Sequence, residues 1–177
     1  NRSGNSSAPY LAASGSSVYV IWSDVDGYNM RQSDNAGMTF GATRNLTTLF
    51  GIPAFGSCAL AAAGSNVYLS CQQSVVSGDN DIFVSRSNDN GTTFSALQNI
   101  SMTASTGSNK SRIAASGSNV YVVWEEGFSS TSEVYLARSI DSGVSFAAPQ
   151  NISSAAESST GPAVDADGTN VWLVWSD

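Results

Sequence analysis

The side chains that could do chemistry in this chain are few, and most of them are acidic. The 177 residues include 14 acidic and 7 basic side chains and no histidine. Without histidine, Ser-His-Asp and Cys-His nucleophilic catalysis are excluded, and the commonest transition-metal ligand is missing. The net charge of −7, with a single lysine, argues against a surface that binds nucleic acid.

Carboxylates could still act as a general acid and base, and Glu125-Glu126 is the one adjacent pair of acidic residues in the sequence. The pair follows an apolar run without an accompanying cluster of arginines, so we interpret it as part of a solvated turn. Three other acidic motifs begin like a calcium loop but lack the downstream glutamate of an EF-hand. These motifs are Asp24-Val-Asp26-Gly27, Asp79-Asn80-Asp81 and Asp165-Ala-Asp167-Gly168. We expect no metal site and no cofactor.

Asparagines in Asn-x-Ser/Thr sequons are the most numerous candidates for modification. They are Asn1, Asn5, Asn45, Asn90, Asn99, Asn109 and Asn151. Such sequons accept N-glycans in secreted proteins, so we expect a glycosylated protein outside the cell or on its surface. Two structural alternatives stay open: Asn45, Asn99 and Asn151 share one repeat register, and Asn90 could simply form a turn.

A repeat spans the whole chain and carries these residues. Segments that begin at Gly15, Gly64, Gly117 and Gly168 align, with spacings of 49, 53 and 51 residues. Three Ser-x-Asp/Asn-x-Gly segments between them are spaced by 54 and 52 residues; they are Ser33–Phe40, Ser87–Phe94 and Ser139–Phe146. Internal periods of this length are typical of propellers and solenoids.

Each period predicts four short strands. A strand of small residues, a Gly-Ser-Asn hairpin turn and an apolar strand come first. A third strand leads into the Ser-x-Asp-x-Gly loop, and we expect the fourth to start at the aromatic residue that closes this loop. The composition, rich in Val, Tyr, Phe and Trp, favours strands over helices. The predicted fold is therefore an all-β propeller of four-stranded antiparallel sheets, called blades, with a period near 52 residues.

The predicted blades occupy residues 8–46, 57–102 and 111–153, with half a blade at 162–175 in a single domain of residues 1–177. A closed propeller needs about four to eight blades. We therefore expect either that the chain continues beyond Asp177 or that another chain completes the fourth blade. The second alternative would produce an oligomer or a filament by strand complementation.

The loop segments resemble the Asp-box of the sialidase-like BNR-repeat propellers. The defining positions are Ser33, Asn35, Gly37 and Phe40 in the first copy, Ser87, Asp89, Gly91 and Phe94 in the second, and Ser139, Asp141, Gly143 and Phe146 in the third. The first copy departs from the pattern, because Asn35 stands where aspartate is expected. In that family the Asp-box is structural and lies far from the active site, so the resemblance implies the fold.

The two cysteines lie on the first and second strands of one predicted blade. Pairing these strands across the turn at Gly64 places Cys58 opposite Cys71. We therefore predict a cross-strand disulfide, with two buried free thiols as the alternative.

The resemblance implies an exo-sialidase or another glycosidase, and sialidases use three arginines to bind the substrate carboxylate. The family's Arg-Ile-Pro motif is absent, because Gly51-Ile52-Pro53 lacks the arginine and Ser111-Arg112-Ile113-Ala114 lacks the proline. Arg86 and Arg138 occupy equivalent repeat positions, which indicates blade structure. The charged residues without a repeat counterpart are Lys110, Arg112, Glu125, Glu126, Glu133 and Glu157.

The sequence thus favours a non-catalytic secreted surface protein. We expect a structural or adhesive scaffold that self-associates through strands or blades, with a glycan as a further candidate ligand. The alternative is a fragment of an exo-sialidase-like glycoside hydrolase or of its carbohydrate-binding propeller. No apolar run reaches the roughly 18 residues of a membrane-spanning helix, so we expect no membrane span.

Overall fold

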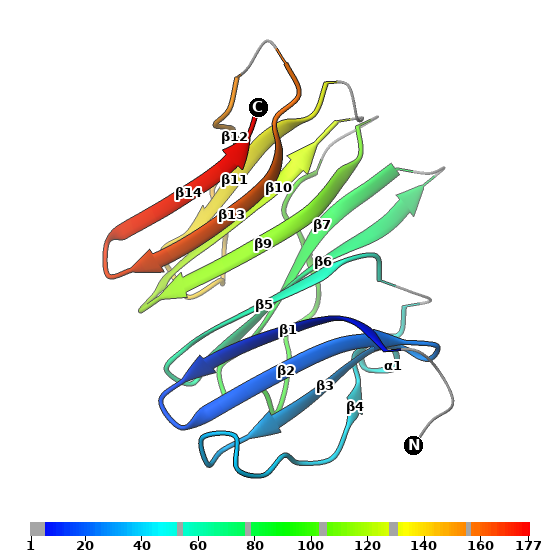
Figure 1. Cartoon of the computed structure of the whole chain (residues 1–177), viewed down its shortest axis with the longest axis vertical. Helices are drawn as coiled ribbons and strands as arrows, with labels where there is room; N and C mark the ends of the chain where they lie inside the picture. The colour runs from blue at the N-terminus through cyan, green and yellow to red at the C-terminus, as the bar shows by residue number, and fades with distance from the viewer. Residues whose placement is uncertain (1–5, 53–54, 77–78, 103–105, 128–130, 155–156) are drawn as a thin grey trace.

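The computed structural model describes residues 6–52, 55–76, 79–102, 106–127, 131–154 and 157–177. In this part of the chain, fourteen strands form four antiparallel sheets, and the five-residue helix α1 (Leu46–Phe50) follows the first of them (Figure 1). The all-β prediction is confirmed.

The strands of each sheet follow one another in sequence order. The first sheet contains β1 (Ser7–Ser14), β2 (Ser17–Asp24), β3 (Gly27–Ser33) and β4 (Arg44–Asn45). The second contains β5 (Cys58–Ala63), β6 (Asn66–Val76), β7 (Asp79–Ser87) and β8 (Gln98–Asn99). The third contains β9 (Ser108–Ser116), β10 (Asn119–Glu126), β11 (Glu133–Ser139) and β12 (Gln150–Asn151). The fourth contains β13 (Thr160–Asp167) and β14 (Asn170–Ser176).

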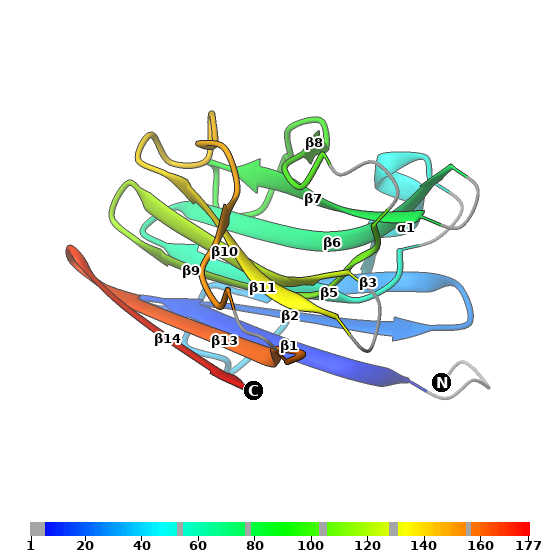
Figure 2. The same cartoon turned by 90° about the horizontal axis from the view of Figure 1, so that it is seen from above.

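The first strands of the sheets, β1, β5, β9 and β13, lie side by side where the sheets converge (Figure 1), and we call them the inner strands. Seen from above, β1 and the β13–β14 hairpin lie on the same side of the molecule (Figure 2). Small residues such as Ala59 and Ala61 let these strands approach one another, which explains the small residues predicted for the first strand of each period.

The hydrophobic core lies between the faces of neighbouring sheets. Tyr19 and Ile21 of the first sheet pack with Leu69 of the second in one cluster. A second cluster joins the opposite face of the second sheet, through Tyr68, to Trp124 of the third. Because each sheet buries its neighbour's face, the stacking of sheets supplies the burial that one sheet alone could not.

The hairpin turn between the first two strands of each sheet needs glycine. Gly64 and Gly117 have φ angles of +59° and +57°, and the residue that follows each of them has negative φ. This pattern fits a type II′ turn, whose twist matches that of the flanking strands.

The fourth strands are shorter than predicted and begin later. Strands β4, β8 and β12 pair over two residues each, so the aromatic that closes each loop lies outside them. Between the aromatic and the short strand, the chain makes a separate bond to the third strand, as where the Ser95 amide donates to the Arg86 carbonyl at 2.8 Å.

Burial differs sharply between the third sheet and the fourth. All but the first residue of β10 is buried, whereas exposed and half-buried residues alternate along β14. Trp172 and Val174 keep 54% and 64% of their surface exposed. Within the described residues β14 pairs with β13 alone. No helix in the described part of the chain is long and apolar enough to cross a membrane.

Candidate functional site

The three loops that resemble Asp-boxes, for which we keep this name, lie at one end of the inner strands. The Asn90 amide donates to the Ser65 carbonyl at 2.9 Å, and the Ser142 amide donates in the same way to Ser118 at 2.9 Å. Each loop therefore binds the hairpin turn that follows the inner strand of its own sheet. We call this the Asp-box end.

The second loop closes through its serine and aspartate. The Ser87 hydroxyl donates to Asp89 at 2.7 Å and accepts from the Gly91 amide at 2.8 Å. Asp89 also accepts from the Thr93 amide at 2.9 Å and from the Thr93 hydroxyl at 2.6 Å. These hydrogen bonds, led by that of the Thr93 hydroxyl, lower the pKa of Asp89 from 3.8 to about 2.

The third loop repeats this geometry with serine in place of threonine. Ser139 donates to Asp141 at 2.7 Å, and the Ser145 hydroxyl donates to the same carboxylate at 2.6 Å. The bond from Ser145 is the main cause that holds the pKa of Asp141 well below its ordinary value.

The first loop keeps the same shape without a carboxylate. Asn35 Oδ1 accepts from the Ser33 hydroxyl and from the Thr39 amide, both at 2.9 Å. Its amide nitrogen donates to Thr39 Oγ1 at 2.7 Å, so the direction of that bond is reversed. Asn35, which replaces the aspartate of the pattern, therefore keeps the geometry of the loop.

The closing aromatics are half-buried: Phe40, Phe94 and Phe146. The Asp-box pattern predicts buried aromatic anchors at Phe94 and Phe146; both rings are instead only half-buried, at the edge of the core between two sheets. Phe94 makes an edge-on contact with Phe50, at 6.1 Å between ring centres, and lies under the Arg44 guanidinium at 5.9 Å.

Charged residues without a repeat counterpart gather at the opposite end of the inner strands. Lys110 forms an ion pair with Glu125 at 3.0 Å, and the Gly161 amide donates to the same carboxylate at 2.8 Å. The Lys110 side chain is 61% exposed, whereas that of Glu125 is 7% exposed. We call this the Lys110 end; it presents an oriented ammonium group at the surface.

Two cross-sheet contacts extend the Lys110 end toward the second and first sheets. Gln72 Nε2 donates to Asn109 Oδ1 at 3.0 Å. The Arg112 guanidinium lies over the Tyr10 ring, 5.3 Å from its centre. Tyr10 and Arg112 stand at equivalent repeat positions, five residues before the turn glycines Gly15 and Gly117.

Glu126 is a structural acceptor and not part of a solvated turn. Both Glu125 and Glu126 are buried, so the sequence interpretation of this pair is wrong. The Glu126 carboxylate accepts from the Ser108 hydroxyl at 2.6 Å and from Trp124 Nε1 at 2.8 Å. Thr106 donates to its other oxygen at 2.5 Å.

A sequence signal for this arrangement exists but was missed. An acidic residue follows the second-strand tryptophan by two positions at Trp22/Asp24, Trp124/Glu126 and Trp175/Asp177. In the fourth sheet Trp175 Nε1 and Ser159 Oγ donate to Asp177 at 3.0 and 2.6 Å, as their counterparts do to Glu126. Glu126 is thus a repeat feature, which leaves Glu125 as the carboxylate specific to the third sheet.

Arg31 and the repeat arginine Arg138 do not join the Lys110 end. Arg31 donates to the Gly41 and Phe40 carbonyls at 2.7 and 3.0 Å, beside the first Asp-box. Arg138 lies over the Tyr121 ring at 5.9 Å. These contacts hold the loops and third strands of their sheets, as periodic recurrence indicated.

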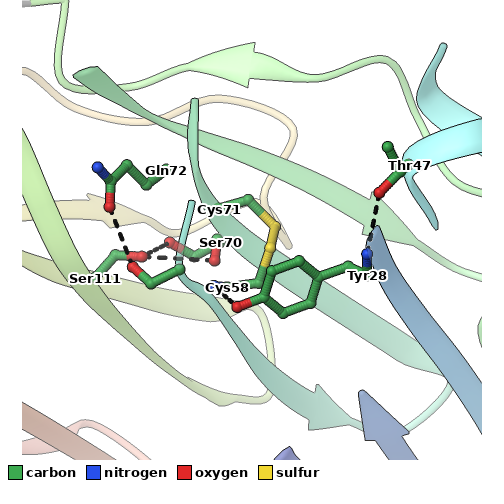
Figure 3. Close-up of a disulfide and its surroundings, with 8 residues drawn as sticks. Tyr28, Thr47, Cys58, Ser70, Cys71, Gln72 and Ser111 are labelled. Atoms are coloured by element: carbon green, nitrogen blue, oxygen red, sulfur yellow. Dashed lines mark hydrogen bonds between the residues drawn. A yellow bond between two sulfur atoms is a disulfide. The ribbon is translucent and has the colours of Figure 1, made fainter. Parts of the chain in front are cut away.

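The predicted disulfide is confirmed (Figure 3). Cys58 and Cys71 are direct partners in the β5–β6 ladder, with 4.1 Å between their Cα atoms, and are bonded. Both are buried, and the Cys58 amide donates to the Tyr28 hydroxyl of the neighbouring sheet at 3.1 Å. Burial is the main cause that raises the pKa of Tyr28.

The periodic sequon asparagines make structural hydrogen bonds. Asn45 caps α1 by accepting from the Thr48 amide at 2.7 Å, and Asn99 accepts from the Met102 amide at 3.0 Å. Asn151 accepts from the Ser154 amide at 3.0 Å. These hydrogen bonds support a structural role for the three asparagines, and their glycosylation stays a prediction.

The other sequons differ in their surroundings. Asn109 is tied to Gln72, whereas Asn90 is exposed at the tip of its Asp-box. Asn90 has a φ of +56°, which asparagine tolerates better than most residues. Asn1 and Asn5 lie outside the described residues.

The acidic motifs do not converge. Among the described residues, no group of three Cys, Asp or Glu side chains is placed to hold a metal ion. Asp24 accepts from the Asp26 amide at 2.9 Å within its own turn, and Asp81 accepts from Asn99 and Ser101 at 2.7 and 2.8 Å.

Comparison with known proteins supports the fold. No protein-family model matches the sequence, and no curated protein does. The Hadza microbial sialidase Hz136 aligns over 90% of this chain and 39% of its own, with a TM-score of 0.63 and 14% identity. A Dyadobacter fermentans protein of unknown function aligns over 90% of this chain and 53% of its own, with a TM-score of 0.66 and 12% identity.

A GH43 endo-arabinanase from Bacillus licheniformis is a third neighbour. It aligns over 94% of this chain and 63% of its own, with a TM-score of 0.57 and 11% identity. The fold is that of a β-propeller. Its four sheets are three four-stranded blades and the β13–β14 pair, and the chain spans less than two thirds of each of these neighbours.

Proposed function

We propose that this chain is the non-catalytic, carbohydrate-binding part of a glycoside-hydrolase-like propeller, and that the Lys110 end holds the sugar. The observation that carries the proposal is the gathering of Lys110, Arg112 and Glu125 at one end of the inner strands. The equivalent positions of the other blades carry no charged residue. A binding site must break the repeat, because a ligand without the propeller's pseudo-symmetry meets each blade differently.

The chemistry of this end suits a polar ligand that carries hydroxyl and carboxylate groups. Lys110 offers an ammonium held by a buried partner, and Arg112 offers a planar guanidinium that matches a carboxylate. Asn109 and Gln72, which are half-buried nearby, add amide groups that can exchange their mutual hydrogen bond for one to a sugar.

A non-catalytic role follows from how the two carboxylates are engaged. Glu126 accepts from three donors, and Glu125 is held by Lys110 and the Gly161 amide. A general acid or base must exchange its proton with the substrate, which these contacts oppose. The neighbours named a sialidase and an endo-arabinanase support a carbohydrate as the ligand, and the contacts of the two carboxylates support binding without cleavage.

The test is equilibrium binding of acidic and neutral oligosaccharides to the 177-residue chain, measured by calorimetry. The decisive variant is Lys110→Ala/Glu125→Ser, which installs the first blade's residues, Ala8 and Ser23, at the equivalent positions. Ala8 has a φ of +48° and Lys110 one of +50°, so the backbone accepts the change. We expect at least tenfold weaker binding.

The matched control is Arg86→Gln, which installs the first blade's Gln32 at the Asp-box end. It removes one cation but should leave sugar affinity unchanged. Absence of saturable binding by the unaltered chain, or equal loss in both variants, would refute the proposal. A fluorogenic sialoside should not be cleaved, and measurable turnover would disprove the non-catalytic part.

A scaffold that self-associates is the second candidate. The exposed Trp172 and Val174 on β14 favour it, because exposed apolar side chains on an edge strand invite another chain. Sedimentation over a range of protein concentrations tests it, and a monomer at all concentrations would exclude it for the 177-residue chain.

A further inference from the structure

A cavity of about 400 Å³ lies between the third blade and β14. Its lining residues are Asn119, Tyr121, Leu136, Arg138, Ala147, Ala148, Gln150, Thr169 and Val171. We infer that this cavity is a docking seat for an Asp-box hairpin. The occupant is an extended strand that pairs with the edge of β14, followed by a Ser-x-Asp-x-Gly turn that covers Tyr121 and Arg138. This surface is at the Asp-box end and goes beyond sugar binding.

The first two blades show how such a seat is filled. Gly91 of the second Asp-box sits on the first blade, where a Cβ would lie 3.3 Å from the Tyr19 ring and 3.5 Å from Gln32 Oε1. Gly143 of the third Asp-box sits on the second blade, where a Cβ would lie 3.1 Å from Tyr68. Each box therefore packs onto the tyrosine of the preceding blade, and its glycine permits the close approach.

The third blade offers the same platform. Tyr121 and Arg138 are strand partners, as are Tyr19 with Gln32 and Tyr68 with Arg86. No Asp-box in the described part of the chain covers this pair. Instead the cavity opens there, and the Arg138 guanidinium lies over the Tyr121 ring.

The edge of β14 has the register that the hairpin requires. Val67 and Val120 pair with the box serines Ser87 and Ser139, and Val171 is their repeat equivalent. A strand added to β14 in the same register would therefore place its box serine opposite Val171, which lines the cavity.

A backbone acceptor is also in place for the turn. The Ser65 and Ser118 carbonyls accept from the amides of Asn90 and Ser142 in the boxes of their own blades. Thr169 is the equivalent residue of the fourth blade, and it too lines the cavity. Tyr121, the register at Val171 and the carbonyl of Thr169 therefore all fit the same occupant. This occupant is a third strand with its Asp-box, which adds to the edge of β14 by β-augmentation.

The probe for this seat is a fluorescein-labelled peptide that copies residues 133–146, the third strand and Asp-box of the third blade. Its binding to the intact 177-residue chain is measured by fluorescence anisotropy. We expect saturable binding, and at least tenfold weaker binding of the peptide that carries Gly143→Ala. The added methyl meets the tyrosine, and the native φ of +74° disfavours alanine.

A pair of protein variants locates the peptide. Ala148 is exposed and lines the cavity, so Ala148→Trp should fill the seat and abolish binding without unfolding the protein. Ala96 is its exposed equivalent in the second blade, whose seat Gly143 already occupies, and Ala96→Trp should leave binding unchanged. Equal melting temperatures of the two variants establish that both are folded.

Three results would overturn the inference. The first is a failure of the peptide to bind, and the second is equal binding of the unaltered and Gly143→Ala peptides. The third is a stable dimer, seen by light scattering, that excess peptide does not dissociate; pairing of β14 with a second copy would produce it.

Discussion

At the scale of single residues, an Asp-box closes with either a carboxylate or an amide. Asp89 accepts the Thr93 hydroxyl, whereas Asn35 donates to the Thr39 hydroxyl, and the serine and glycine contacts are the same in both loops. The hydroxyl can reverse its role because it both donates and accepts. The carboxylate adds charge-assisted hydrogen bonds, and with them a dependence on pH.

We predict that the second and third Asp-boxes weaken in acid. The pKa of Asp89 in the fold, about 2, lies below its ordinary 3.8, so the ionised box stabilises the fold above about pH 4. This contribution is lost as the pH falls through 4 toward 2. The double variant Asp89→Asn/Asp141→Asn should therefore lose less melting temperature between pH 5 and pH 2 than the unaltered chain, as circular dichroism would record.

The control for this experiment removes the same charge elsewhere. Asp165 and Asp167 are exposed and lie outside all three boxes, and their conversion to asparagine changes the net charge equally. This control variant should retain the acid sensitivity of the unaltered chain. If it loses that sensitivity as well, general charge repulsion and not the Asp-box explains the pH dependence.

The sequence predicted which residues form the boxes but not how Glu125 and Glu126 are held. The serine and aspartate side chains of a box bond to neighbours within four positions, so a local pattern contains these bonds. The partners of Glu126 include Ser108, which is 18 residues away, and Glu125 reaches Gly161, which is 36 residues away. Pairing of strands and packing of blades create these contacts, and local patterns cannot show them.

At the scale of strands, one position distinguishes the second blade from the others. This position holds Cys71 in the second blade and tryptophan in the first, third and fourth blades. In those three blades the pairing between the first and second strands contains a register shift. The shifted segments include Ala8, Lys110 and Gly161, all with positive φ. In the second blade the β5–β6 ladder has no shift and Cys58 pairs directly with Cys71, which gives the close approach that a disulfide needs.

We predict that the disulfide stabilises the second blade by about 3 kcal/mol, the chain-entropy value for a loop of this size. The bonded residues are 13 apart in sequence. Guanidinium unfolding with and without reductant should show the difference. The variant Cys58→Ala/Cys71→Ala should match the reduced chain and be insensitive to reductant; a reductant effect on this variant would point to a cause other than the disulfide.

The periodic pattern predicted the first three strands of each blade better than the fourth. Apolar runs such as Val120–Trp124 must be strands that are covered on both faces, and β10 is one. The fourth strands pair over only two residues, and Gln98 and Asn99 have no apolar alternation to indicate them. Bulges were also missed, because they arise from pairing between strands and Lys110 has an ordinary local sequence.

At the scale of the whole molecule, the blades form a series in which position decides burial. The second blade is covered on both faces, since the two core clusters lie on either side of it. The fourth is covered by the third alone among the described residues, and its β14 is half-exposed. In repeat proteins stability is approximately a sum of repeat and interface contributions, so equivalent residues contribute according to their neighbours.

This view yields a prediction from two equivalent tryptophans. Trp124 is fully buried and Trp175 is half-buried, although both hydrogen-bond to an acidic residue two positions later. Trp124→Ala should lower the free energy of unfolding by about 3–5 kcal/mol, because it leaves a large cavity between the second and third blades. Trp175→Ala should cost less than half as much. Guanidinium unfolding of both variants makes the comparison, and equal losses would contradict the dependence on neighbours. If the seat peptide completes the fourth blade, its addition should bring the effect of Trp175→Ala closer to that of Trp124→Ala, since the added strand would bury the side chains of β14.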